Sequence, residues 1–238
     1  MPGRANVEIY ACDADDMGWY DVVDFKALSS DERIRAERFF DSQDAHRYRI
    51  AHALLRSLLG AATGMPAAAL VLKAGRHGKP YLSNGPSFNL SHSGSRIVIG
   101  LMQRGKIGVD VEVIKPIEDA DRLALRWFSE EEVEALSSLR GEQWLIGFFR
   151  IWTRKEAFVK ALGGGLSIAL DSFSVSLDDV SDDLLLSGSS PLVRRQTWSI
   201  RAIDIEPGVE AAVAVDCKEF ELRNTLLTPD NVTHTLVT

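Results

Sequence analysis

The chain of 238 residues lacks the features that mark secreted, membrane-spanning and zinc-binding proteins. Its two cysteines, Cys12 and Cys217, stand far apart and form no CxxC pair, so we expect neither a disulfide framework nor a zinc site. The first residues, MPGRANVEIY, lack the apolar run of a signal peptide. No stretch reaches the about 20 apolar residues that a membrane helix needs. We therefore expect a cytoplasmic protein with no membrane contact.

The chain also lacks the excess positive charge that is typical of nucleic-acid-binding proteins. Lys and Arg number 27 and Asp and Glu number 34, which gives a formal net charge of −7. Because binding to nucleic acid usually needs a basic surface, we expect no nucleic-acid partner. Basic residues do gather locally, for example at Arg33, Arg35, Arg38 and Arg47. Such clusters indicate either a site for a small anionic ligand or solvated helix faces.

Helical and strand-like segments alternate along the sequence, which predicts an α+β fold. Helical periodicity covers residues 28–40, 46–59 and 142–162, and strand-like runs cover 7–11, 97–102, 107–113, 173–177, 198–204 and 211–215. Gly105 predicts a hairpin turn between the strands at 97–102 and 107–113. Both halves run from helices through a glycine stop to strands. We therefore expect two similar α+β subdomains, residues 1–105 and 106–238, with a cleft between them.

Two carboxylates share one face of the strand predicted over residues 107–113. In IGVDVEV the apolar residues alternate with Gly108, Asp110 and Glu112, so these three point to the same side. Neighbouring carboxylates repel each other, and a hard divalent cation that also binds substrate phosphates relieves the repulsion. Gly108 would leave room for a ligand there. A half-exposed strand whose polar face meets water is the alternative, and this segment taken alone favours it.

Charged residues interrupt an apolar stripe on the helix predicted over residues 142–162. The stripe consists of Leu145, Phe148, Phe149 and Trp152. Lys155 and Glu156 occupy its next positions, and Lys160 follows Glu156 by one turn. Charges on a buried stripe are costly without partners, so Glu156 could supply a third carboxylate and the lysines could neutralise phosphate charge. An ordinary surface Glu–Lys pair is the alternative.

Taken together, these segments resemble the signature motifs of the Sfp-type 4′-phosphopantetheinyl transferases. IGVDVE at 107–112 resembles the family's (I/V)-G-(I/V)-D-(I/V)-E, and WTRKEAFVK at 152–160 resembles its W-x-x-K-E-(A/S)-x-x-K. Further similarity lies in DAHR at 44–47, GKP at 78–80, FNLSHS at 88–93, GLS at 165–167 and LDSF at 170–173. One departure is Glu32, which stands where related enzymes often carry a lysine.

The resemblance implies a fold, a metal site and a coenzyme A site. The fold would consist of two similar α+β subdomains related by an approximate two-fold, with coenzyme A in the cleft. Mg²⁺, or Mn²⁺, would be bound by Asp110, Glu112 and Glu156 and held against the pyrophosphate. The residues implied to contact coenzyme A are Arg47, Lys79, Ser91, His92 and Lys155, the last through a phosphate.

The resemblance also implies a reaction. The phosphopantetheine arm of coenzyme A would pass to a serine of an acyl or peptidyl carrier protein, and 3′,5′-ADP would leave. Glu156 would act as general base toward the serine, and Lys160 would stabilise the departing ADP oxygen. We expect a monomer that docks its carrier near residues 115–125. Two alternatives remain at this point: another metal-dependent phosphoryl-transfer enzyme and a non-catalytic carrier-binding module.

Overall fold

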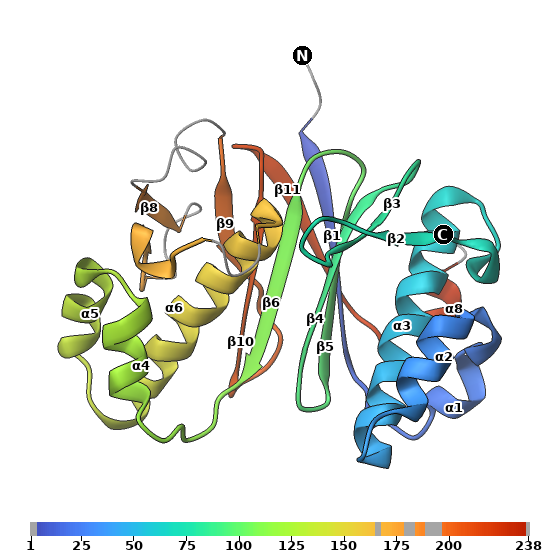
Figure 1. Cartoon of the computed structure of the whole chain (residues 1–238), viewed down its shortest axis with the longest axis horizontal. Coiled ribbons are helices and arrows are strands. Elements are labelled where there is room, and N and C mark those ends of the chain that lie inside the picture. Colours follow the sequence, from blue (N-terminus) through green and yellow to red (C-terminus); the bar gives the residue numbers. More distant parts are fainter. Residues whose placement is uncertain (1–3, 165–167, 179–183, 189–196, 237–238) are drawn as a thin grey trace.

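The computed structural model, which describes residues 4–164, 168–178, 184–188 and 197–236, has a mixed α+β architecture. Two sheets lie in the middle of the molecule and helices cover their outer sides (Figure 1). Helices α1 to α3 lie on one side, and α4 to α6 lie on the other (Figure 1). The prediction of an α+β fold is therefore confirmed. The GLS motif at residues 165–167 lies outside the described residues.

One sheet has four strands in the order β11-β1-β5-β4. These strands are β1 (Ala5–Asp13), β4 (Ser87–Ser93), β5 (Arg96–Met102) and β11 (Phe220–Leu226). β1 and β4 run antiparallel to β5, whereas β11 runs parallel to β1. The accompanying elements are α1 (Trp19–Val22), α2 (Ser30–Glu37), α3 (Ser42–Thr63), α8 (Val232–Thr235) and a small hairpin of β2 (Leu72–Ala74) and β3 (Pro80–Leu82).

The other central sheet has three antiparallel strands in the order β6-β10-β9. These strands are β6 (Ile107–Val113), β10 (Val209–Val215) and β9 (Ser199–Ala202). Its helices are α4 (Ala120–Trp127), α5 (Glu130–Ser137) and α6 (Gly141–Leu162), and a separate pair joins β7 (Phe173–Val175) to β8 (Leu185–Gly188). Among the described residues, no helix has the length and apolar character to cross a membrane.

Three hydrophobic cores hold these layers together. The first core packs α3 against the four-stranded sheet and includes Ile50 and Leu54. The second packs α6 against the three-stranded sheet and includes Phe158. The third contains Ile9 and Val109 and joins the inner faces of the two sheets. Burial of apolar surface on both faces of each sheet therefore fixes how the two sheets meet.

The helices of the two halves share several local features. α3 and α6 each have 22 residues, and each ends at a glycine in the left-handed conformation, Gly64 at φ 68° and Gly163 at φ 69°. The left-handed φ suits glycine because it has no Cβ. The shorter helices α2 and α5 each begin with a capping box, formed by Ser29 with Glu32 and by Ser129 with Glu132.

The predicted hairpin between residues 97–102 and 107–113 is wrong. β5 pairs with β1 and β4, whereas β6 pairs with β10. Gly105, at φ 114°, turns the chain out of one sheet and into the other. The Asp216 carboxylate accepts the Lys106 backbone N–H at 2.6 Å, which ties the start of β6 to the end of β10. A local turn signal therefore found the turn but not the pairing partner, which lies about a hundred residues further along the chain.

Candidate active site

The two faces of β6 meet different surroundings. Three side chains on one face are fully buried between the sheets: Ile107, Val109 and Val111. Asp110 and Glu112 point to the other side, as the alternation predicts. Gly108 shares that side, but a Cβ there would lie 2.1 Å from the Ala157 carbonyl oxygen of α6. The space that we expected Gly108 to leave for a ligand is therefore filled by the backbone of α6.

Asp110 lies at the centre of a small polar cluster in which both halves take part. Its Oδ1 accepts hydrogen bonds from Lys160 Nζ of α6 at 2.5 Å and from Ser91 Oγ of β4 at 2.9 Å. Lys160 Nζ also donates to Ser91 Oγ at 2.9 Å. Only 4% of Asp110 is exposed, and burial raises the pKa of its carboxyl although Lys160 favours the ionised form. Its second oxygen, Oδ2, is buried without a hydrogen-bond partner.

Glu112 and Glu156 bring two more carboxylates to this cluster. Glu112 Oε2 accepts a hydrogen bond of 2.6 Å from Ser93 Oγ of β4. Burial raises the pKa of Glu156, and the negative charges of Asp110 and Glu112 raise it further. Burial likewise raises the pKa of Glu112, with Asp110 adding to the effect. The three predicted carboxylates therefore lie close enough to repel one another.

These carboxylates have the donor chemistry that a hard cation needs. In the described part of the chain, no three His, Cys, Asp or Glu side chains stand at metal-binding spacing in their present arrangement. Asp110 Oδ2 is nonetheless a buried oxygen without a partner, and Lys160 is the cation that now contacts the carboxylate. Carboxylate oxygens with unmet charge are the ligands that Mg²⁺ takes together with substrate phosphates. The residue set therefore fits a divalent cation.

Lys155 does not reach this cluster. Its side chain is fully buried, and its Nζ forms an ion pair with Glu132 at 2.8 Å. The same Nζ donates to the carbonyls of Leu170 at 2.7 Å and Phe173 at 2.6 Å. All three N–H groups of the ammonium thus have partners in the core of the second half. The predicted phosphate contact of Lys155 is therefore replaced by a structural ion pair.

Glu32 has the same kind of role in the first half. It is the N3 residue of the α2 capping box, and its Oε2 lies 2.6 Å from Arg56 Nε. His52 Nδ1 approaches its other oxygen at 3.4 Å. Burial would raise the pKa of Glu32, but hydrogen bonds from His52 and Arg56 outweigh burial and lower it to about 2. The departure from lysine at this position is thus explained by a buried ion pair.

Arg47 lies on α3, and His92 lies on β4 next to Ser91 of the carboxylate cluster. Asp15 holds the Arg47 guanidinium through two hydrogen bonds, from Nε at 2.8 Å and from Nη2 at 2.6 Å. His92 is exposed on β4. Although the residue is exposed to solvent, partial desolvation of the imidazole ring lowers the pKa of His92, and the positive charges of Lys160 and Arg47 lower it further. These effects indicate that positive charge surrounds His92, and such surroundings suit an anionic ligand.

Lys79 lies in the loop before β3, and its side chain reaches the start of β6 and the last turn of α6. Its Nζ donates to the carbonyls of Ile107 at 2.6 Å and Lys160 at 2.7 Å. Burial, followed by the charges of Lys106 and Lys160, lowers the pKa of Lys79 to about 8. A cavity of about 310 Å³ lies beside it, lined in part by His77, Asn89, Glu156 and Lys160. This cavity opens directly beside the carboxylate cluster.

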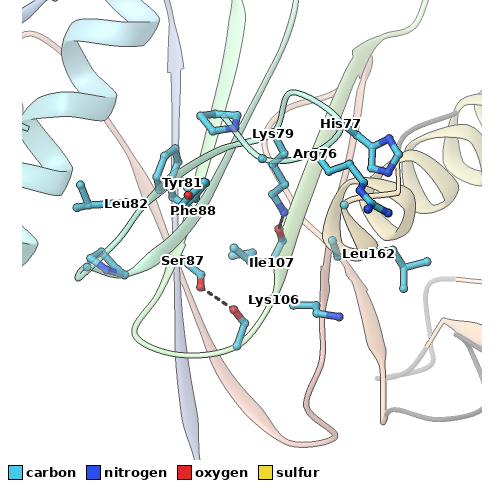
Figure 2. Close-up of a pocket in the computed structure, with 17 residues that line it drawn as sticks. Arg76, His77, Lys79, Tyr81, Leu82, Ser87, Phe88, Lys106, Ile107 and Leu162 are labelled. Carbon is cyan, nitrogen blue, oxygen red and sulfur yellow. Dashed lines mark hydrogen bonds between the residues drawn. The ribbon is translucent and has the colours of Figure 1, made fainter. Parts of the chain in front are cut away.

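A second cavity, of about 370 Å³, lies on the side of Lys79 that faces β3 and the turn between β5 and β6. Figure 2 shows the Lys79 side chain crossing it toward Ile107, with Arg76 and His77 near the end of α6. Ser87 at the opposite wall donates to the Gly105 carbonyl at 2.6 Å (Figure 2). Lys79 therefore lies between the two cavities and lines both of them.

Comparison with known proteins identifies the family. The profile of the 4′-phosphopantetheinyl transferase superfamily matches residues 106–215, and that of the 4′-phosphopantetheinyl transferase N-terminal region matches 19–103. The 4′-phosphopantetheinyl transferase Sfp of Bacillus subtilis is 32% identical over 81% of this chain and 84% of its own length. HetI of Nostoc sp. is 34% identical over 79% of this chain and 78% of its own length. The chain belongs to the 4′-phosphopantetheinyl transferase superfamily.

Sequence reasoning missed two residues that hold predicted site residues and a third that holds the strand between them. Asp15 binds Arg47, and Ser93 binds Glu112. Asn89 Oδ1 accepts the Val109 backbone N–H at 2.8 Å. The alternation of Asn and Ser in FNLSHS indicated a polar strand face. It could not indicate what that face contacts, because β4 and β6 belong to different sheets.

Proposed function

We propose that the protein transfers the 4′-phosphopantetheine arm of coenzyme A to a serine of an acyl or peptidyl carrier protein and releases 3′,5′-ADP. The observation that carries this proposal is the cluster in which Asp110 Oδ1 contacts both Lys160 of α6 and Ser91 of β4. It joins the two signature motifs with a third segment at one place. Membership of the family supports the same reaction.

Asp110, Glu112 and Glu156 would hold Mg²⁺, with Mn²⁺ as a substitute. When bound, the cation supplies positive charge against the pyrophosphate of coenzyme A. The buried, partnerless Oδ2 of Asp110 and the mutual repulsion of the three carboxylates support this assignment. Glu156 is the proposed general base, because burial and its acidic neighbours raise its pKa and so favour uptake of the serine proton.

Lys160 would stabilise the oxygen that leaves as 3′,5′-ADP. Its Nζ already lies between Asp110 Oδ1 and Ser91 Oγ, at 2.5 and 2.9 Å. An ammonium group held in this way needs little rearrangement to donate to a developing oxyanion. Ser91 itself is a proposed contact of coenzyme A.

Arg47, His92 and Lys79 are the other proposed contacts of coenzyme A. Arg47 and His92 would meet the 3′-phosphate, which agrees with the positive charges around the His92 ring. Lys79 borders the cavity of about 310 Å³ that also contains Glu156 and Lys160. Because the Lys79 ammonium bonds two backbone carbonyls, we expect it to shape the wall of this cavity as well as to attract anions.

We also propose the finer organisation of the fold. Residues 1–105 and 106–238 would form two subdomains related by an approximate two-fold, with β11 assigned to the sheet of the first. Matched capping boxes and matched buried ion pairs, Glu32–Arg56 and Glu132–Lys155, support this relation. The protein would act as a cytoplasmic monomer, without nucleic acid.

Carrier proteins would dock on the segment that follows β6. On α4, Leu125 is 69% exposed, and the Arg122 side chain is 81% exposed. An acidic carrier helix with an apolar anchor complements such a surface. This surface, rather than the carboxylate cluster, would select the carrier, including carriers of secondary-metabolite biosynthesis.

One assay tests the proposed function. The full chain is incubated with coenzyme A, Mg²⁺ and an apo-carrier protein, and the carrier is weighed by mass spectrometry. We expect a mass gain of one phosphopantetheine arm, with 3′,5′-ADP formed in equal amount, and loss of both when a chelator replaces Mg²⁺. An unmodified carrier across acyl and peptidyl types would contradict the proposal.

A further inference from the structure

We propose that Ser93 is a positioning residue that fixes Glu112 in readiness for the divalent cation. This inference rests on the proposed function, because it takes Glu112 as a ligand of that cation. Among the described residues, Ser93 forms no hydrogen bond with the side chain of Lys160 or of a proposed coenzyme A contact. Its role would therefore be confined to one carboxylate.

The hydrogen bonds of Ser93 leave its hydroxyl one direction in which to donate. Ser93 is 8% exposed, and its Oγ accepts the Val113 backbone N–H at 3.2 Å. The hydroxyl carries a single hydrogen, which it donates to Glu112 Oε2 at 2.6 Å. Hydrogen bonds from a hydroxyl to a carboxylate are short and strong because the acceptor is charged. The backbone of β6 thus orients the hydroxyl that in turn holds a carboxylate of β6.

This arrangement orders the Glu112 side chain before a cation arrives. Glutamate has three side-chain torsions, and leaving them unfixed would cost binding free energy at the moment of coordination. Ser93 donates to Oε2, and the other oxygen, Oε1, accepts no hydrogen bond from the described residues. Glu112 therefore resembles Asp110, in which Oδ1 is anchored and Oδ2 is left without a partner.

β4 offers a matched control on the same strand face. Ser87 and Ser93 are both serines of β4, separated by an even number of residues, and both donate to an acceptor beyond their own sheet ladder. The Ser87 acceptor is the Gly105 carbonyl, whereas the Ser93 acceptor is a carboxylate of the cluster. Removing the Ser87 hydroxyl deletes its hydrogen bond to Gly105, whereas removing the Ser93 hydroxyl deletes the bonds to Glu112 and to the Val113 N–H, so only the Ser93 change touches the proposed metal site.

The experiment compares the full-length parent with Ser93→Ala, Ser93→Cys and Ser87→Ala. Mn²⁺ binding is measured by the electron paramagnetic resonance signal of the unbound ion, without coenzyme A or carrier, and Mg²⁺ affinity by competition. We expect Ser93→Ala to weaken both affinities about tenfold, as removal of partners of metal ligands commonly does. The affinities of Ser93→Cys should lie between those of the parent and of Ser93→Ala, because a thiol is a weaker hydrogen-bond donor than a hydroxyl. Ser87→Ala should match the parent.

A kinetic readout separates positioning from general damage to the fold. The Mg²⁺ concentration for half-maximal transfer should rise about tenfold in Ser93→Ala, while kcat at saturating Mg²⁺ stays near the parent value. Equal Mn²⁺ affinity in the parent and Ser93→Ala would overturn the inference but leave transfer by the parent intact. A parent that binds no Mn²⁺ would overturn the metal assignment as well, which the mass assay of the parent distinguishes. If Ser93→Ala does not fold, the comparison of Ser93→Cys with Ser87→Ala decides.

Discussion

At the scale of single residues, the site depends on how Lys160 is shared. Its Nζ bonds both Asp110 Oδ1 and Ser91 Oγ, so one ammonium connects a strand of each half with α6. The pairing compensates the charge of a carboxylate that is only 4% exposed. The same ammonium would stabilise the leaving oxygen during transfer. Its two roles can be separated by charge-conserving and charge-removing changes.

Lys160→Met should lower kcat by about 100-fold or more, because a positioned proton donor contributes on that order. The KM for coenzyme A should change less than kcat, since the ammonium acts mainly on the developing charge. Lys160→Arg keeps the charge and serves as the matched variant, and its activity should lie between that of the parent and that of Lys160→Met. Steady-state kinetics give both constants. Parent-like kcat in Lys160→Met would remove Lys160 from the mechanism.

Asp15→Ala should weaken the binding of coenzyme A through Arg47. Hydrogen bonding to Arg47 lowers the pKa of Asp15 to about 2, so the pair is ionised at neutral pH. Asp15 fixes the guanidinium at a partly exposed position, so we expect a loss of about 1 kcal/mol, or roughly fivefold in KM, with kcat unchanged. Asp16→Ala, at the next residue, is the control. An unchanged KM in Asp15→Ala would show that Arg47 needs no such support.

At the scale of elements, a buried ion pair links each capping box to the long helix that follows it. Glu132 joins the start of α5 to Lys155 of α6, and its Oε1 also accepts the Val175 N–H of β7 at 2.8 Å. Glu32 joins the start of α2 to Arg56 of α3. Each carboxylate thus serves a helix terminus and a buried cation at once, which explains why neither is available to a ligand.

Glu132→Ala should destabilise the protein by about 3–5 kcal/mol, because it leaves the Lys155 ammonium buried without its counter-ion. Glu134→Ala, on the exposed side of the same helix, should change the free energy of unfolding by less than about 0.5 kcal/mol. Urea denaturation of both variants gives the two values. If Glu132→Ala were as stable as Glu134→Ala, the ion pair would have no structural role.

Glu32 should make stability depend on acid pH. Its pKa falls from 4.5 in the unfolded chain to about 2 in the folded protein. A lowered carboxyl pKa contributes stability that is present above pH 4.5 and is lost as pH falls toward 2. The Glu32→Gln variant should therefore be less stable than the parent at neutral pH and lose less stability over this range. Denaturation curves recorded across this pH range give the free energy of unfolding at each pH. The expectation would be contradicted if this free energy changed with pH equally in the parent and in Glu32→Gln.

The sequence allowed much of the second half to be predicted, because the pattern there is local. Alternation along residues 107–113 predicted which side chains of β6 share a face, and Gly163 marked the end of α6. Lys155 was misassigned because its partner, Glu132, sits on another helix and gives no local signal. The pairing of β6 with β10 was missed for the same reason, because these two strands lie about a hundred residues apart. β4 was missed although its partner β5 follows directly in the chain, because Asn and Ser residues are typical of turns.

At the scale of the whole molecule, the active-site candidates lie where the two central sheets meet. β4 belongs to one sheet and β6 to the other, and side chains rather than a backbone ladder connect them, through Asn89, Ser91 and Ser93. The core between the sheets holds this junction from behind. β11 returns from the end of the chain to pair with β1, which adds a second connection between the halves. A junction fixed by these hydrogen bonds and this core suits a site that must hold charge in fixed positions.

The measurement that tests this account most directly is transfer by Asp110→Ala and Glu156→Ala, because one residue lies on β6 and the other on α6. Both variants are assayed with coenzyme A, Mg²⁺ and apo-carrier, and the modified carrier is quantified by mass spectrometry. We predict that each loses transfer by about 1000-fold or more while circular dichroism and the thermal midpoint show a folded protein. Near-parental transfer by either folded variant would contradict the carboxylate cluster as the catalytic centre.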